Sequence, residues 1–123
     1  REREELKIVN DQHGTPTYAK DLAEAITIIL EYADKDEWKE GIYHFSNLGD
    51  TTWYGFAEKI KELSKIESCR LIPIETKDYP TAAVRPKYTI LDKTKIQDAF
   101  HCTIPHWEES LKKFIDKLNH STN

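Results

Sequence analysis

The sequence has no methionine and little glycine or cysteine, with four glycines and two cysteines among 123 residues. None of the glycines falls in a GxGxxG motif, so the chain lacks the phosphate-binding turn of a dinucleotide-binding fold. GxSxG, HExxH and P-loop motifs are missing as well. We therefore predict no catalytic residue and no cofactor-binding residue in this chain.

Long apolar runs are also absent, because no unbroken run exceeds three residues, as in Ile28–Leu30. The sequence therefore predicts no membrane span, and its charged first residues lack the apolar segment of an export signal. Cys69 and Cys102 have no CxxC partner, which favours a reducing compartment over a disulfide-bonded scaffold. We expect a cytoplasmic protein that does not bind membranes.

The formal net charge is −4, and lysines and glutamates are mixed along every segment. This mixture offers no basic face to a nucleic-acid backbone, so nucleic acid is not an expected partner. The nearest approach to a metal site is HCTIPH, with His101, Cys102 and His106. Structural metal sites usually have four ligands in paired spacings, so we interpret these three as ordinary residues at helix ends and predict no metal.

The size of the chain suits one core, since 38% of its 123 residues are hydrophobic. We predict a single domain over residues 1–123. Because even an initiator methionine is missing, we expect this domain to be the carboxyl-terminal piece of a longer protein. The periodic segments described next are of both kinds, helical and extended, and predict an α/β fold class.

Residues 6–9, LKIV, are predicted to form a strand ahead of the stretch NDQHGTPTYAKDLA at 10–23. In the helix that follows, apolar residues recur at three- and four-residue spacing. The apolar face is broad enough to be covered on more than one side. Thr17 is predicted to cap this helix, with Asp21 in its positive first turn.

The segment GIYHFSN at 41–47 is rich in aromatic residues and is predicted to be a strand. Residues 53–63 give the clearest helical pattern of the chain, with Thr51 or Thr52 as the cap. Helical spacing assigns three aromatic residues to the core: Trp53, Phe56 and Trp107.

The segment CRLIPIET at 69–76 is predicted to be a short strand, in which Pro73 must lie at an edge or an end. Residues 77–87 show neither a helical nor an alternating period and contain two prolines, which predicts an extended, irregular loop. Loops of this length are more often functional than idle.

The chain is expected to return to an extended form at 88–92, and Asp92 is placed to cap a short helix that ends at Phe100. Pro105 suits the start of a final helix. The apolar face of that helix carries Trp107, Leu111, Phe114, Ile115 and Leu118.

Four stretches, in this order and spacing, resemble the carboxyl-terminal half of the dTDP-4-dehydrorhamnose reductases: VNDQHGTPTYAKDLA, GIYHFSN, TTWYGFAEKI and YPTAAVRPKYTILD. These enzymes are extended short-chain dehydrogenase/reductases. The match spans about residues 6–118, and its specific part is the combination of DQxGxPT with YPTxAxRPxYxxLD. Thr89 stands where the family often has serine, and His13 falls at a variable position. The fold that the resemblance implies is the small substrate-binding domain of a Rossmann-type reductase, with about four helices and short strands.

The activity that the resemblance implies is hydride transfer from NADPH, sometimes NADH, to the 4-keto group of dTDP-4-dehydro-6-deoxy-L-mannose. The product is dTDP-L-rhamnose, a precursor of cell-surface polysaccharide. In that family an amino-terminal Rossmann half holds the cofactor and a Tyr-x-x-x-Lys pair, whereas no tyrosine here has a lysine four residues later. The expected partners are therefore a nucleotide sugar and the protein's own Rossmann domain, with homodimerisation as a further expectation. The fragment alone is expected to be inactive and to bind no cofactor.

Five residues are candidates for substrate binding: Arg85, Gln12, Thr15, Thr17 and Tyr79. A guanidinium in a proline-stiffened loop suits bidentate contact with a diphosphate, although Arg85 could also be a solvated loop residue. Gln12, Thr15 and Thr17 lie in a turn beside a helix amino terminus, where amides and hydroxyls can meet an anion, although Thr17 could serve only as a cap. Tyr79 could line the same cleft or simply pack before Pro80.

Two other functions stay open on the sequence. The same extended family includes a non-catalytic regulatory subunit of methionine adenosyltransferase with similar motifs, and it also includes other nucleotide-sugar epimerases and dehydratases. An intact glycine motif and Tyr-x-x-x-Lys pair upstream in the parent chain would favour an enzyme. The DQxGxPT turn suits the reductase better than an epimerase or a dehydratase.

Overall fold

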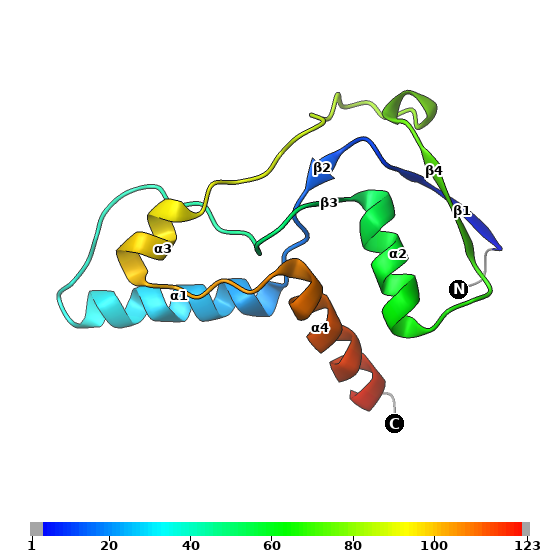
Figure 1. The fold of residues 1–123 in the computed structure, drawn as a ribbon. Coiled ribbons are helices and arrows are strands. Elements are labelled where there is room, and N and C mark those ends of the chain that lie inside the picture. Colours follow the sequence, from blue (N-terminus) through cyan, green and yellow to red (C-terminus); the bar gives the residue numbers. More distant parts are fainter. Residues whose placement is uncertain (1–3, 122–123) are drawn as a thin grey trace.

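The computed structural model of the chain describes residues 4–121. In this part of the chain four α-helices accompany short strands, which confirms the predicted mixture. Figure 1 shows β1, β4 and α2 at one end of the molecule, α1 and α3 at the other, and α4 starting between them. The predicted domain runs from 1 to 123, and residues 1–3 and 122–123 lie outside the described residues. None of the described helices is long and apolar enough to span a bilayer.

Two parallel strands, β1 (Glu5–Val9) and β4 (Arg70–Ile74), pair in register and confirm both strand predictions. A parallel pair needs a long crossover, and here the crossover includes helix α2 (Trp53–Ser64), which contacts both strands. Pro73 is exposed and lies in β4, which has a neighbour on one side only within the described residues. This is the edge position that a proline in a strand requires.

The first core lies between α1 (Ala19–Asp34) and α3 (Thr94–Phe100), as Figure 1 shows. The ring of Phe100 is at its centre, edge-on to Tyr32 and Tyr43 at centroid distances of 5.3 and 5.2 Å. The buried members of this core are Ala25, Ile96, Phe100, Cys102 and Ile104.

The second core lies between α2 and α4 (Trp107–Ser121). Trp107 is buried, and its ring meets Phe56 edge-on at 6.0 Å, so both of these core assignments are confirmed. The assignment of Trp53 to the core is wrong, because its side chain is 58% exposed. Helix α2 packs through Phe56, Ile60 and Leu63, and at 100° per residue this face leaves Trp53 at its margin. On α4, Phe114 and Leu118 are half-exposed, while Leu111 and Ile115 are buried.

The strand predicted at 41–47 does not form. Tyr43 and Phe45 pack against the first core, which explains the aromatic pattern, but no described strand lies beside this segment to pair with its backbone. Ile42 is 79% exposed. The aromatic pattern therefore predicted correctly that Tyr43 and Phe45 pack against a core. It predicted a strand wrongly, because a strand also needs a neighbouring strand with which its backbone can pair.

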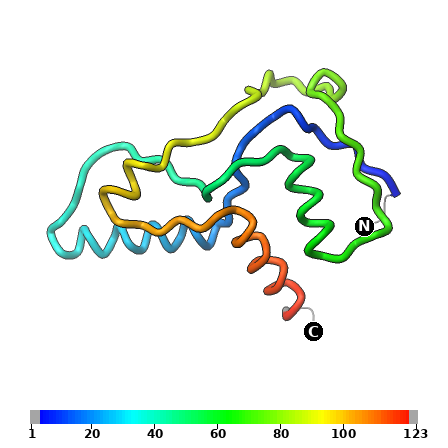
Figure 2. The backbone as a smooth tube through the Cα atoms, in the orientation of Figure 1, coloured from blue at the N-terminus to red at the C-terminus, as the bar shows by residue number. Residues whose placement is uncertain are grey.

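In the segment 88–92, Tyr88 forms an isolated bridge with His13, and no strand is formed. Asp92 accepts a hydrogen bond from the Thr94 amide at 2.9 Å, and the helix ends at Phe100, as predicted. Figure 2 shows the chain between the short 3₁₀ helix η1 (Thr76–Asp78) and α3 running along one edge of the molecule.

The two predicted helix caps have opposite outcomes. Thr52 accepts a hydrogen bond from the Gly55 amide at 3.0 Å and caps α2 as predicted. Thr17 does not cap α1, because its hydroxyl donates to the carbonyl of Thr15 at 3.4 Å. The amide of Tyr18 donates instead to Oδ1 of Asn47 at 2.8 Å, so the cap comes from a distant residue.

Candidate functional site

The turn at residues 10–17 forms one side of the candidate site, and backbone and side-chain contacts hold it against the segment before α2. The short strand β2 (His13–Gly14) pairs antiparallel with β3 (Thr51–Thr52). The hydroxyl of Thr15 donates to the carbonyl of Gly49 at 2.6 Å. The backbone of the turn is therefore fixed relative to the start of α2.

The same turn holds the beginning of the loop that carries Arg85. The carboxylate of Asp11 accepts hydrogen bonds from the Thr76 amide, at 3.0 and 3.1 Å, and from the Thr76 hydroxyl. These bonds hold the pKa of Asp11 below its usual range, which keeps the carboxylate an acceptor at neutral pH. The side-chain amide of Gln12 donates to the Thr76 hydroxyl at 3.2 Å.

The far end of the loop is held by the next residue of the turn. The amide of His13 donates to the carbonyl of Lys87 at 2.7 Å, and its carbonyl accepts from the Thr89 amide at 2.9 Å and from the Thr89 hydroxyl at 3.1 Å. Residues 77–87 are thus tied at both ends to three consecutive residues of one turn. The loop itself is exposed, but its position is set by these contacts.

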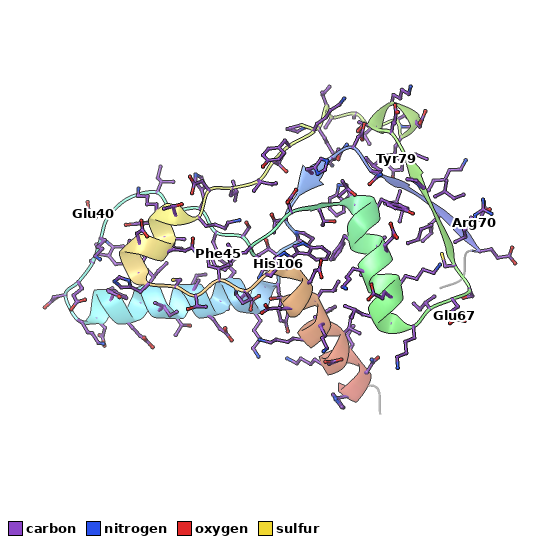
Figure 3. The ribbon with its side chains drawn as sticks, viewed as in Figure 1. Glu40, Phe45, Glu67, Arg70, Tyr79 and His106 are labelled. Carbon is purple, nitrogen blue, oxygen red and sulfur yellow. The ribbon has the colours of Figure 1, made fainter. Side chains whose placement is uncertain are left out.

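A cavity of about 230 Å³ lies where the turn, the start of α2 and the loop meet. An adjoining cavity of about 550 Å³ extends toward β1 and the beginning of the loop. Three residues line both cavities, Gln12, Trp53 and Arg85, so we treat them as two parts of one cleft. Tyr79, which Figure 3 shows just after η1, lines the larger part.

The charged side chains that line the cleft are Lys7 and Arg85, both cations. No aspartate or glutamate from the described residues lines either part, although the chain as a whole carries a net charge of −4. Arg85 is exposed, and within residues 4–121 neither an ion pair nor a hydrogen bond holds its guanidinium. Its donors are therefore available to an anionic ligand.

Four of the five predicted site residues line the cleft, namely Arg85, Gln12, Thr15 and Tyr79. The amide of Gln12 and the hydroxyl of Thr15 each donate a hydrogen bond to a protein acceptor, which holds the walls of the cleft, and their binding of substrate stays a prediction. Thr17 lies elsewhere, in an apolar depression of about 320 Å³ between the start of α1 and α4.

Sequence reasoning missed Trp53 as a cleft residue and placed it in the core. A signal was present, because Trp53 is the first residue of α2, directly after the capping threonine, and lies at the margin of the face formed by Phe56, Ile60 and Leu63. The hydroxyl residues Thr51 and Thr89 also line the cleft. No motif in the sequence distinguishes these two threonines from the other threonines of the chain.

His101, Cys102 and His106 do not come together as a possible metal site, and no such group of three or more ligand side chains occurs among the described residues. Cys102 is buried in the first core, and burial raises the pKa of its thiol. His106, labelled in Figure 3, lies just before α4 and accepts a hydrogen bond from the Glu108 amide at 3.2 Å.

Comparison with known proteins places this chain in a family. Residues 1–120 match the family model described as the RmlD substrate binding domain. The spore coat polysaccharide biosynthesis protein SpsK of Bacillus subtilis (strain 168) is 36% identical over 115 residues, which are 94% of this chain and 38% of that protein. The dTDP-4-dehydrorhamnose reductase of Escherichia coli (strain K12) is 33% identical over 123 residues, covering 96% of this chain and 41% of the enzyme.

A solved structure agrees with these relatives. The crystal structure of dTDP-4-dehydrorhamnose reductase from Bacillus anthracis str. Ames, in complex with NADP, has a TM-score of 0.82 at 34% identity. It covers 94% of this chain, and this chain covers 38% of it. The chain thus spans about two fifths of the length of the relatives it matches. Because the family model matches nearly the whole chain and a solved reductase shares both sequence and fold, the chain belongs to the RmlD substrate-binding domain family.

Proposed function

We propose that this chain is the substrate-binding part of an NADPH-dependent reductase that converts dTDP-4-dehydro-6-deoxy-L-mannose to dTDP-L-rhamnose. The observation that carries the proposal is the cleft, whose lining charges are all positive in an acidic chain. A nucleotide sugar brings a diphosphate with two negative charges, and a cation-lined, acid-free cleft favours such a ligand. The names of the relatives supply the particular sugar nucleotide.

Arg85 is the residue that we propose to hold the diphosphate. Its guanidinium can donate two parallel hydrogen bonds to neighbouring phosphate oxygens. Pro86 follows it directly, and both ends of its loop are bonded to the turn at 11–13, so little ordering entropy is lost when the ligand binds. Tyr79 belongs to the same loop and lines the larger part of the cleft, and we propose that it contacts the ligand as well.

We propose that NADPH, or NADH, is held by an amino-terminal Rossmann domain of the full-length protein. The cofactor supplies the hydride that reduces the sugar's 4-keto group to an alcohol. This chain has neither the glycine motif nor the Tyr-x-x-x-Lys pair, so its own residues bind and orient the sugar nucleotide. The relative from B. anthracis that was solved with NADP is longer than this chain and supports that division.

Helix α1 offers a surface for that partner domain. Its second apolar side, formed by Leu22, Ile26 and Leu30, is 39 to 61% exposed, as its broad apolar face suggested. Apolar side chains in a row on a helix are normally covered by another element. A second copy of the protein is a further proposed partner, for which the half-exposed Phe114 and Leu118 of α4 offer apolar surface.

The proposed location is the cytoplasm. Cys69 and Cys102 are both buried and free, in agreement with a compartment that keeps thiols reduced. A nucleotide-sugar reductase also needs a supply of reduced nicotinamide cofactor, which is a cytoplasmic metabolite.

The test is a reductase assay on the full-length protein. We expect consumption of NADPH that requires dTDP-4-dehydro-6-deoxy-L-mannose, and no consumption by residues 1–123 alone. A keto sugar on guanosine diphosphate serves as the matched control substrate. If the full-length protein bound the dTDP sugar without consuming NADPH, the non-catalytic binding alternative would replace the reductase.

A further inference from the structure

Trp53 is packed differently from the aromatic residues nearest to it on α2 and α4. The rings of Phe56 and Trp107 meet edge-on, whereas Trp53 makes no ring contact with any other aromatic residue in the described part of the chain. Its side chain is 58% exposed. A tryptophan left this open on a folded domain is a common feature of binding surfaces, where its large rigid ring gives much contact area at a low entropy cost.

The position of Trp53 connects it with Arg85. Both residues line the smaller and the larger part of the cleft, so the indole and the guanidinium border the same space. No acidic side chain from the described residues shares that space with them. The cleft therefore combines an open aromatic ring with an unpaired cation.

We propose that Trp53 is the platform on which the base of a nucleoside diphosphate stacks while Arg85 holds the diphosphate. This inference deepens the proposed function and rests on it for the class of ligand. A planar base stacks on an indole, and the phosphates that follow it then lie beside the guanidinium. The two residues thus account for two chemically different parts of one ligand.

The base, rather than the sugar, is assigned to Trp53 for a reason of geometry. Hydride transfer requires the sugar carbon to contact the cofactor, which this chain does not hold. The base lies at the opposite end of the ligand, across the diphosphate. The base is therefore the part of the ligand that this domain can bind throughout the reaction without blocking the cofactor.

The backbone beneath Trp53 is fixed before any ligand arrives. Trp53 is the first residue of α2, and the preceding Thr52 is buried. The Thr52 hydroxyl donates to Oδ1 of Asn10 at 2.7 Å and accepts from the Gly55 amide at 3.0 Å. The platform is thereby linked to the turn at 10–17, and the ring has only two side-chain torsions left to order.

The experiment compares Trp53→Leu and Trp53→Phe with Trp38→Leu in the full-length protein. Trp38 is a matched control, because it is 56% exposed and lines neither part of the cleft. Thymidine diphosphate and inorganic pyrophosphate are titrated by calorimetry, and thermal melts are recorded alongside. We expect Trp53→Leu to weaken thymidine diphosphate about tenfold, Trp53→Phe to retain most of the affinity and Trp38→Leu to change nothing.

Titration with pyrophosphate distinguishes a failure of the stacking role of Trp53 from a failure of the proposed function. It has no base, so its affinity should be unchanged in Trp53→Leu and reduced in Arg85→Ala. If Arg85→Ala weakens thymidine diphosphate and Trp53→Leu does not, the platform is overturned and the proposed function stands. If the wild-type protein binds no thymidine diphosphate, both are overturned. A lower melting temperature for Trp53→Leu with unchanged affinity would show that the amino-terminal half covers Trp53, which also overturns the platform.

Intrinsic fluorescence gives a second readout that does not depend on the Leu variant folding. Stacking of a base quenches the indole beneath it, so thymidine diphosphate should quench the wild-type protein and the Trp38→Phe variant alike. The quenching should disappear in Trp53→Phe. Equal quenching in all three proteins would rule out contact between the base and Trp53.

Discussion

Gly49 shows how much of the cleft wall depends on a single residue. Its φ is +86°, a left-handed conformation that residues with a side chain rarely adopt. A Cβ built there would clash with the ring of His106, and the carbonyl of Gly49 is the acceptor that holds Thr15 in the turn. Glycine is therefore required both by the backbone and by the ring beside it.

We predict that Gly49→Ala lowers the free energy of unfolding by about 1 to 3 kcal/mol, because it adds both backbone strain and a clash. Gly14→Ala is the control, since a Cβ at Gly14 would meet the Thr89 hydroxyl at 3.1 Å and no left-handed φ opposes it. Its loss should be clearly smaller in denaturant-induced unfolding. Equal losses for both variants would mean that the conformation at Gly49 carries no special cost.

The site residues illustrate what the sequence could and could not predict at this scale. The turn and the proline-stiffened loop were expected beside a ligand cleft, and Arg85, Gln12, Thr15 and Tyr79 do line it. Trp53 was placed in the core because helical spacing resolves only about 100° per residue and does not show where a neighbouring helix stops covering a face.

Among the structural elements, the starts of α1 and α4 are joined by the side chain of Asn47, which is fully buried. Its amide nitrogen has two hydrogens to donate, and three acceptors within reach share them: Oδ2 of Asp21 at 2.7 Å, the carbonyl of Pro105 at 3.1 Å and Oγ of Ser110 at 3.2 Å. Its oxygen accepts from the Tyr18 amide at 2.8 Å. One residue thus caps one helix and fixes its angle to another.

We predict that Asn47→Ala is among the most destabilising single changes in the chain. It leaves the Tyr18 amide without its acceptor and removes one of the two donors to Oδ2 of Asp21, and each loss costs about 1 to 3 kcal/mol. Thr17→Ala, which removes the cap expected from the sequence, should change the free energy of unfolding by less than about 0.5 kcal/mol. Chemical denaturation of both variants checks this order, and a reversed order would restore Thr17 as the cap.

Helices and caps differ in how far the sequence could specify them. The helices were predictable because apolar periodicity is a local signal, and the Thr52 cap is local too, reaching only to Gly55. The cap of α1 comes from a residue 29 positions away, and local pattern carries no information about such a contact. The failed strand at 41–47 has the same cause, since pairing depends on a distant neighbour.

The molecule as a whole has two packed cores and two exposed surfaces, which are the outer side of α1 and the cleft. The α1–α3 core and the α2–α4 core are each complete enough to hold their helices, while the outer side of α1 and the cleft remain exposed. The turn at 10–17 connects both regions to the loop that carries Arg85. The cleft and the outer side of α1 are therefore the surfaces at which we propose that a nucleotide sugar and an amino-terminal domain bind.

A titration of the full-length protein with dTDP-rhamnose tests most directly our proposal that Arg85 holds the diphosphate of a nucleotide sugar. Arg85→Ala should lose about 1.5 to 3 kcal/mol of binding free energy, or about one to two decades in affinity, and Arg85→Lys should recover only part of it. Melting temperatures should stay unchanged, because Arg85 has no partner within the described residues. Equal affinities for all three proteins would contradict the claim, and matched losses of affinity and melting temperature would make Arg85 a structural residue instead.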